Sequence, residues 1–348
     1  MSDQKLIEVE NLKVYFPIRS GGLFRRQIGA VKAVDGLSFY INKGETLGLV
    51  GESGSGKTTV GRAILRALDP TEGQVTFYLD DGQAVDVTAL QGKELRNFRR
   101  HMQLIFQDPR SSLNPRMTVR DIIAEPLVAN KLMKGKAVDE RVRETAALCK
   151  LNLEHLRRFP HAFSGGQRQR IGIARALVSR PQFIVCDESV SALDVSIQAE
   201  ILNLLMDLQA ELGVTYLFIA HDLSVVAHIS DRVAVMYVGQ LVELAATEKL
   251  FFSPKHPYTE ALLSAIPEVD PDQAMKPVVL RGEIPNPANP PPGCRFHTRC
   301  PYVEDICKTD QPAWQEIEPE HFVACHFAGT LQLKGVVADT AAENGRNT

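Results

Sequence analysis

The sequence predicts an α/β fold with buried parallel strands, and three observations support this. A strand-like run, a glycine-rich turn and a helical run follow one another over residues 46–65. Two more short apolar runs, Phe183–Cys186 and Val214–Ala220, each end directly before acidic or histidine side chains. Such apolar runs are typical of parallel strands covered on both faces. Ligands of these sheets collect at the carboxyl ends of the strands, so we expect a binding site there.

The N-terminal segment predicts two or three antiparallel strands ahead of the glycine-rich turn. Residues 6–18 alternate well enough for a strand, residues 20–30 are typical of a loop, and strand character returns over residues 33–45. Phe16 or Tyr15 precedes the turn and is able to stack on an adenine ring. A core aromatic is an equally good interpretation of either residue.

The turn itself reads GESGSGKTT and matches the G-x-x-x-x-G-K-[ST] pattern of a phosphate-binding loop. Its glycines let the backbone N–H groups face phosphate oxygens, and the following helix adds the positive end of its dipole. Lys57 can reach the β- and γ-phosphates of a nucleoside triphosphate, and the Thr58 hydroxyl can ligate Mg²⁺. An ordinary turn would leave the ordered Gly-Lys-Thr unexplained. The expected nucleotide-binding residues are Gly51, Glu52, Ser53, Gly54, Ser55, Gly56, Lys57, Thr58 and Thr59.

An apolar strand over residues 102–106 ends at Gln107, whose neutral side chain is able to touch both Mg²⁺ and the attacking water. A buried amide is the alternative interpretation. The pattern from Val119 to about Leu156 is helical with mixed charge. Because this stretch lies between strands, we interpret it as an inserted helical subdomain.

A second possible anion cradle follows, where Ser164-Gly165-Gly166-Gln167 stands directly before another helical run. A helix start of this kind exposes several N–H groups and a hydroxyl. One nucleotide does not need two cradles so far apart in the sequence. We therefore expect a dimer in which the second cradle of each chain covers the γ-phosphate of its partner. The alternative, which spacing alone favours, is a capped helix N-terminus.

Polar residues close two of the buried strands. Asp187 can hold Mg²⁺ through water, and Glu188 can polarise the water that attacks the γ-phosphate. His221 ends the next strand and can hydrogen-bond the γ-phosphate. Adjacent surface carboxylates and a structural histidine are the alternatives, but parallel strands bring all three side chains to one edge.

The composition excludes several classes of protein. The formal net charge is −3, whereas a general nucleic-acid coat needs a basic field. No run approaches the ~18 apolar residues of a membrane span, and the N-terminus has no apolar secretory segment. We expect a cytosolic protein that is able to dock on a membrane protein.

A small lobe rich in cysteine follows a polyproline-like spacer at residues 285–293. It has little aliphatic core, so it needs a further stabilising element such as a bound metal. Gaps of five, six and seventeen residues separate its cysteines, without the C-x2-C pairs usual for zinc. All-thiolate ligation of an iron–sulfur cluster is compatible with such gaps, and nearby histidines keep zinc as an alternative. The expected metal ligands are Cys294, Cys300, Cys307 and Cys325. The other two cysteines, Cys149 and Cys186, are expected to be simply buried.

The order and spacing of these motifs resemble the ATP-binding subunit of an ABC transporter over roughly residues 5–250. The run FSGGQ, where LSGGQ is usual, is diagnostic of that family. Ser189-Val190 departs from the commoner Pro-Thr, which leaves the chemistry untouched. The matching motifs are Walker A at Gly51–Thr58, the Q-loop at Gln107, the signature at Phe163–Gln167, Walker B with its catalytic glutamate at Phe183–Glu188, the D-loop at Ser191–Asp194 and the switch histidine at His221.

The resemblance implies a P-loop NTPase fold with an ABC-type antiparallel β subdomain, a helical subdomain at about 110–180 and a small cysteine-containing extension. It places Phe16, ahead of Tyr15, at the adenine-stacking position and adds Asp194 to the nucleotide-binding residues. ATP at each of two sites is then held between Walker A of one subunit and the signature of the other. Closure and hydrolysis drive membrane subunits that contact the Q-loop and the helical insert.

The C-terminal region sharpens the resemblance. His256-Pro257-Tyr258 and residues 289–301 look like the C-terminal domain of bacterial dipeptide/oligopeptide importer ATPases, whose F-type subunit the whole chain resembles. Some of these subunits carry a [4Fe-4S] cluster at such cysteines. The resemblance implies an extension at 251–330, and the polar residues 331–348 predict a disordered tail.

The implied partners are a second ABC ATPase (a D-type chain in preference to another copy), two transmembrane permease subunits and, indirectly, an extracytoplasmic peptide-binding protein, with no nucleic acid. The implied location is the cytoplasmic face of the bacterial inner membrane. An importer ATPase for nickel chelates or glutathione is an alternative, as are a soluble ABC ATPase and a redox-sensing regulator.

Overall fold

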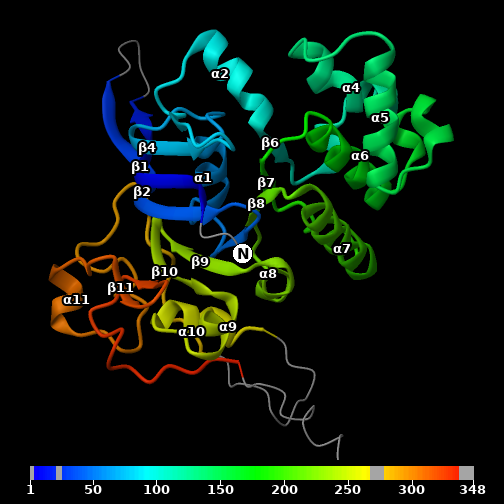
Figure 1. Cartoon of the computed structure of the whole chain (residues 1–348). Coiled ribbons are helices and arrows are strands. Elements are labelled where there is room, and N and C mark those ends of the chain that lie inside the picture. The colour runs from blue at the N-terminus through cyan, green and yellow to red at the C-terminus, as the bar shows by residue number, and fades with distance from the viewer. Residues whose placement is uncertain (1–3, 21–25, 267–277, 337–348) are drawn as a thin grey trace, which may run out of the picture. The chain divides into compact units, whose positions relative to one another are not determined.

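The structure is a computed structural model that describes residues 4–20, 26–266 and 278–336 (Figure 1). It divides into two compact units. The first unit consists of Met1–Tyr15, Val34–Leu49 and Lys57–His221, and the second of Phe16–Ala33, Val50–Gly56 and Asp222–Thr348. No described helix combines the length and the apolarity that crossing a membrane requires.

A parallel sheet forms the core of the first unit. Its strands lie in the order β3 (Thr46–Val50), β8 (Thr215–Ile219), β7 (Phe183–Asp187) and β6 (Met102–Ile105). Every residue of β3, β7 and β8 is buried, as expected for strands covered on both faces. The predicted parallel strands are therefore confirmed, and their carboxyl ends lie along one edge.

Helix α1 (Lys57–Ile64) packs closely on this sheet. A Cβ built on Gly61 would lie 2.7 Å from Val185 Cγ1 and 3.0 Å from Ile219 Cδ1, so only glycine allows this approach. Helix α7 (Val195–Leu212) begins at the Asp194 cap and ends at Gly213, which has a φ of 67°. The described part of the first unit therefore builds α/β layers around β3, β6, β7 and β8.

The predicted antiparallel strands form a separate sheet in the order β2-β1-β4-β5. Strands β1 (Lys5–Arg19) and β2 (Gln27–Asn42) precede the glycine-rich turn, as expected. Strands β4 (Glu72–Tyr78) and β5 (Ala84–Asp86) follow α1, and β4 pairs with β1 in antiparallel register. Helix α2 (Gly92–Phe98) and a 3-10 turn at Arg99–His101 then lead to β6.

Helices fill the sequence between β6 and β7, as the helical insert predicts (Figure 1). Helix α4 packs on both α5 and α6, and it begins at Thr118, whose side chain accepts a hydrogen bond from the Asp121 N–H. The elements are α3 (Pro109–Ser112), α4 (Val119–Ala129), α5 (Lys136–Leu148), 3-10 turns at Leu153–Arg157 and Pro160–Ala162, and α6 (Gly165–Leu177).

The second unit holds an antiparallel sheet in the order β11-β12-β10-β9. Strands β9 (Arg232–Tyr237) and β10 (Gln240–Ala246) form a hairpin turned at Val238 and Gly239. The sequence did not predict β11 (Gln315–Glu318) and β12 (His321–Val323), which extend this hairpin. Helices α8 (Leu223–Ile229), α9 (Thr247–Phe252), α10 (Pro257–Leu263) and α11 (Asp305–Thr309) complete the unit.

An aromatic cluster forms the core of the second unit. Tyr237, Tyr258 and Phe296 are fully buried, with ring centroids 4.6–5.4 Å apart. The C-terminal lobe, which is the described part of residues 251–330, contributes Tyr258 and Phe296 to this core and thus uses aromatic residues where it has few aliphatic ones. The Lys334 N–H donates to Glu260, at the start of the predicted disordered tail 331–348. Residues 337–348 of that tail lie outside the described residues.

Candidate active site

The phosphate loop has the backbone that its sequence predicts. Gly51, Gly54 and Gly56 have φ values of 147°, 80° and 109°. A Cβ on Gly51 would lie 2.1 Å from the Met236 carbonyl oxygen, and one on Gly56 would lie 2.1 Å from that of Ala33. Glycine is therefore required here both for conformation and for close approach to the rest of the second unit. Helix α1 begins directly after the loop, at Lys57.

Two predicted Mg²⁺ ligands from distant motifs meet in the first unit. The Thr58 hydroxyl donates to Asp187 Oδ1 at 2.7 Å, and the Arg62 guanidinium lies 3.7 Å from Asp187 Oδ2. The Asp187 side chain is 4% exposed at the end of β7. A hydroxyl beside a carboxylate fits the oxygen ligands that Mg²⁺ prefers. These residues can therefore hold the ion that accompanies ATP.

The three predicted catalytic side chains also converge. Gln107 Nε2 donates to Glu188 Oε2 at 2.6 Å, and His221 Nδ1 lies 3.8 Å from Glu188 Oε1. The Glu188 side chain is 20% exposed, which leaves room for water beside the carboxylate. Its φ of 46° is in the left-handed region, and its N–H donates to the Ile219 carbonyl at 2.9 Å. Strain of this kind is frequent where a side chain must be aimed at a reaction.

The predicted signature forms the start of α6. Ser164 Oγ accepts from the Gln167 N–H at 3.3 Å, and the Ser164 N–H donates to Gln167 Oε1 at 3.1 Å, which is a capping box. Both side chains are exposed. A Cβ on Gly166 would lie 2.4 Å from Ile197 Cγ2, so the glycine lets α6 approach α7 closely. The capped-helix interpretation is thus correct for the single chain, and it leaves the helix N-terminus at the surface.

Asp194 of the D-loop and the two candidate adenine-stacking residues have different surroundings in the structure. The Asp194 carboxylate caps α7 by accepting from the Ile197 N–H at 3.0 Å. Tyr15 hydrogen-bonds Asp35 through its hydroxyl, whereas Phe16 is 41% exposed. Phe16 therefore has a ring face available for stacking, and Tyr15 is engaged in the fold.

The four cysteines of the C-terminal lobe are free thiols that lie near one another. Burial, with smaller contributions from the neighbouring Cys294, Cys325 and Cys307, raises the pKa of Cys300 to about 12. Burial raises the pKa of Cys325 to about 11. Among the described residues, however, no group of three or more His, Cys, Asp or Glu side chains is arranged to hold a metal ion. The thiols cluster, but as they stand they are not a ligand set for zinc or for an iron–sulfur cluster.

Sequence reasoning missed two residues that contact the phosphate loop. The Arg299 guanidinium makes two hydrogen bonds to the Glu52 carboxylate, at 2.7 and 3.0 Å, and the Tyr258 hydroxyl accepts from the Glu52 N–H at 2.9 Å. Arg299 is 247 positions from Glu52. No local sequence signal joins residues so far apart.

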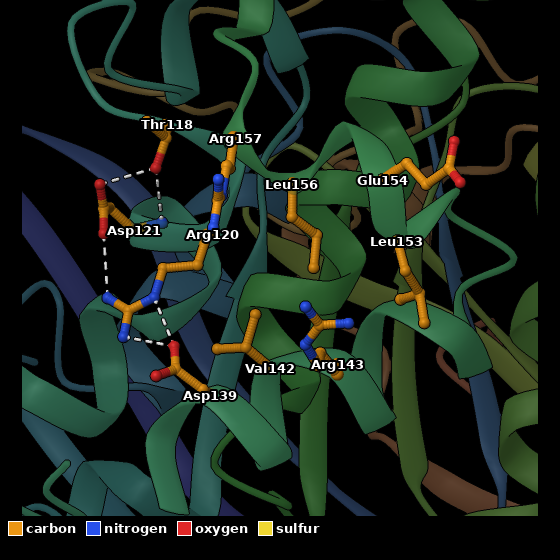
Figure 2. A pocket seen from close by; sticks show the side chains of 10 residues that line it. All are labelled: Thr118, Arg120, Asp121, Asp139, Val142, Arg143, Leu153, Glu154, Leu156 and Arg157. Carbon is orange, nitrogen blue, oxygen red and sulfur yellow. Dashed lines mark hydrogen bonds and ion pairs between the residues drawn. The ribbon is translucent and has the colours of Figure 1, made fainter. Parts of the chain in front are cut away.

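The helical insert carries an open hollow of about 740 Å³ (Figure 2). Arg120 at its rim donates to Asp139 at 2.7 Å and to Asp121 at 3.0 Å, as Figure 2 shows. Leu153 and Leu156 supply an apolar part of the lining beside these charges. The hollow thus combines apolar surface with charges of both signs.

Comparison with known proteins gives two family matches. The model described as "ABC transporter" matches residues 34–191, and the model described as "Oligopeptide/dipeptide transporter, C-terminal region" matches residues 242–307. The oligopeptide transport ATP-binding protein AppF of Bacillus subtilis is 53% identical over 94% of this chain and 98% of its own length. A putative peptide import ATP-binding protein of Brucella suis is 51% identical over 93% and 98%.

Solved structures give the same fold. The ATP-binding cassette MJ0796, in a dimeric post-hydrolysis state bound to ADP and Pi, matches with a TM-score of 0.59 and 28% identity over 70% of this chain and 99% of its own. The protein cbiO1 from Clostridium perfringens, part of a transporter complex, matches with a TM-score of 0.61 and 25% identity over 72% and 91%. The first of these proteins is thus an ATP-binding cassette, and the second is part of an ABC transporter complex.

Proposed function

The chain belongs to the family of ABC transporter ATP-binding proteins, and on that premise we propose that it is the ATP-hydrolysing subunit of an importer of dipeptides or oligopeptides. The observation that carries the catalytic part is the meeting of Gln107, Glu188 and His221 beside the Thr58–Asp187 pair. The C-terminal family match and the peptide-transport relatives support the substrate class.

The geometry suits hydrolysis by an activated water. Lys57 and the loop hold the β- and γ-phosphates, and Thr58 with Asp187 holds Mg²⁺, which neutralises phosphate charge when bound. Gln107 and His221 orient the water and the γ-phosphate. Glu188 takes the proton of the water as its oxygen bonds to the γ-phosphorus, and the bond to the bridging oxygen of ADP breaks. The products are ADP and inorganic phosphate.

A second ATPase subunit completes each site. The exposed N-terminus of α6 at Ser164 presents N–H groups and a hydroxyl, a chemistry that suits the γ-phosphate bound by a partner. The dimeric state of the cassette MJ0796 supports the arrangement. We propose a related D-type chain as the partner, with a second copy of this chain as the alternative.

The helical insert is the place where we propose that two transmembrane permease subunits dock. The hollow of Figure 2 offers apolar side chains ringed by charges, a surface suited to a short amphipathic segment. Docking of this kind would hold the protein at the cytoplasmic face of a bacterial inner membrane. An extracytoplasmic peptide-binding protein would then deliver the substrate.

We also propose that the C-terminal lobe holds a thiolate-ligated centre, a [4Fe-4S] cluster with zinc as the alternative. The support is the number of cysteines, their free state and their mutual proximity. Their present arrangement does not support it, because binding would need deprotonation and rearrangement of the thiols. Iron, sulfide and zinc analysis of anaerobically purified protein tests the proposal, and protein free of all three contradicts it.

Reconstitution tests the function as a whole. The chain is co-purified with the subunits that it pulls down from membranes, and the complex is placed in liposomes with the cognate binding protein. We expect ATP hydrolysis to rise on addition of short peptides, and labelled peptide to accumulate across the membrane. If nickel chelates or glutathione stimulate ATP hydrolysis and peptides do not, the proposed peptide substrate is wrong. A complex with Glu188→Gln serves as the control without turnover.

A further inference from the structure

The Glu52 side chain of the phosphate loop is held by the C-terminal lobe. Both terminal nitrogens of Arg299 donate to its carboxylate, at 2.7 and 3.0 Å, which is the bidentate arrangement of a strong ion pair. The Tyr258 hydroxyl accepts from the backbone N–H of the same residue at 2.9 Å. The side chain and the backbone of Glu52 are thus both held by other residues of the second unit.

Arg299 is itself held rigidly. Its side chain is 7% exposed, its guanidinium lies 5.9 Å from the Tyr237 ring centroid, and it donates to the Tyr237 hydroxyl at 3.3 Å. Tyr237 packs against Tyr258 and Phe296 in the aromatic cluster. The hydrogen bonds to Glu52 raise the pKa of Arg299 further above its ordinary value. The pair is therefore partly buried beside the aromatic cluster, unlike a fully exposed ion pair that contributes little.

The rest of the loop depends on the same surroundings. The Gly239 N–H donates to the Ser55 carbonyl at 2.9 Å, and Gly51 lies against the Met236 carbonyl. These contacts hold the loop on the side of β9. The contacts of Gly51 and Ser55 do not involve the Glu52 side chain, which is held by its pair with Arg299.

We propose that Arg299 is a positioning residue for ATP binding, which fixes the phosphate loop through Glu52 and makes the C-terminal lobe a structural part of the nucleotide site. This inference rests on the proposed function, because it assumes that the loop binds ATP. In this role Arg299 contacts the loop residue Glu52 and does not touch the reacting atoms. Its loss therefore weakens the ground state and the transition state alike, which raises KM and leaves kcat unchanged.

The test measures ATP affinity and turnover in the full chain with its partner subunits. We expect Arg299→Gln to weaken binding of a non-hydrolysable ATP analogue about tenfold and to raise KM for ATP by a similar factor, with kcat unchanged. Arg299→Lys keeps the charge but loses the two-pronged geometry, so it should give a smaller loss. A variant that unfolds is recognised by its melting temperature, and Arg299→Lys then carries the test.

A double-mutant cycle identifies Glu52 as the partner. Glu52→Gln should cause a loss similar to that of Arg299→Gln, and the double variant should be no worse than either single one. The matched control is Lys255→Gln, which removes a lobe ion pair with Glu318 that does not involve the loop. It should bind ATP as the unaltered protein does.

The outcomes separate this inference from the proposed function. If the unaltered protein binds ATP no better than Lys57→Ala does, the proposed function fails. If the unaltered protein binds ATP and both Arg299 variants bind it within about twofold, or if kcat falls in place of the rise in KM, the positioning role is wrong.

Discussion

The side-chain amide of Gln107 donates a hydrogen bond to the carboxylate of Glu188 at 2.6 Å. Gln107 follows strand β6, and Glu188 follows the neighbouring strand β7. The contact thus links the entrance of the helical insert to the carboxylate that we propose as the activator of water. On that proposal, a movement of the insert would change the position of this carboxylate and so couple transport to hydrolysis.

Glu188→Gln should retain ATP binding and lose hydrolysis, because an amide cannot take the proton of the attacking water. We expect turnover to fall by about 100-fold or more. Phosphate release and analogue binding, measured on the same sample, check this. Full turnover in this variant would remove Glu188 from the role of general base.

Gln107→Glu should shift the pH dependence of hydrolysis. Two carboxylates at this separation repel each other and share a proton, so the pKa of the pair rises. The acidic limb of the rate profile should move to higher pH by about one unit. Gln103→Glu, on the preceding strand β6, is the control and should leave the profile in place. An unchanged acidic limb in Gln107→Glu would show that the contact is absent during turnover.

Ser164→Arg should act on the partner's site. The arginine disrupts the capping box and blocks the exposed start of α6, whereas the chain keeps its own phosphate loop. In a dimer that contains one altered chain, ATP binding should persist while hydrolysis at the opposite site is lost. Isotopically tagged subunits with one site marked by Glu188→Gln allow the two sites to be distinguished. Loss of ATP binding by the isolated altered chain would contradict a role in trans.

Gly61→Ala and Gly172→Ala should have opposite effects on stability. Both lie within helices, where alanine is intrinsically favoured by up to about 1 kcal/mol. A Cβ at Gly61 would lie 2.7 Å from Val185, and overpacking of this kind costs about 1–3 kcal/mol. A Cβ at Gly172 would meet nothing within 4 Å. Urea denaturation should therefore show Gly61→Ala to be less stable than the unaltered protein and Gly172→Ala to be more stable.

Buried His256 should make the protein less stable in mild acid. Burial lowers the pKa of His256 to about 3, and its Nδ1 accepts a hydrogen bond from the Tyr258 N–H. The unfolded chain takes up a proton at the ordinary pKa of about 6.5, whereas the folded chain does not. The stabilisation is thus complete above about pH 6.5 and is lost as the pH falls toward 3, at up to about 1.4 kcal/mol per pH unit.

Denaturation curves between pH 7.5 and 5, on a purified sample, measure that slope. His256→Asn should make the stability less dependent on pH, and His161→Asn, at an exposed position, should not. An equal slope in both variants would exclude His256 as the titrating group.

The sequence predicted those parts of the site that local patterns encode. Asp187, Glu188 and His221 lie at one edge of the sheet because each stands at the carboxyl end of a buried strand, and the strands are parallel. The resemblance placed Phe16 ahead of Tyr15 at the adenine-stacking position, and this stays a prediction. The structure adds that Tyr15 hydrogen-bonds Asp35 and that Phe16 is 41% exposed.

Other features were beyond sequence reasoning for physical reasons. Strand β12 has only three residues, which is too short for a periodic pattern. It pairs with β10 and β11, and its His321 lies 2.8 Å from the buried Glu243. The Arg299–Glu52 pair joins residues with no shared local signal. The cysteine spacing predicted the ligands of an iron–sulfur cluster or zinc, but the described residues contain no group of side chains arranged to hold a metal ion.

The place of Arg299 in the chain order has a consequence for biosynthesis. A ribosome translates every Walker, Q-loop and signature residue before it reaches Arg299, so a nascent chain exposes the phosphate loop while Glu52 still lacks its counter-ion. On the positioning role proposed for Arg299, full ATP affinity is reached only after Arg299 has left the ribosome and has paired with Glu52.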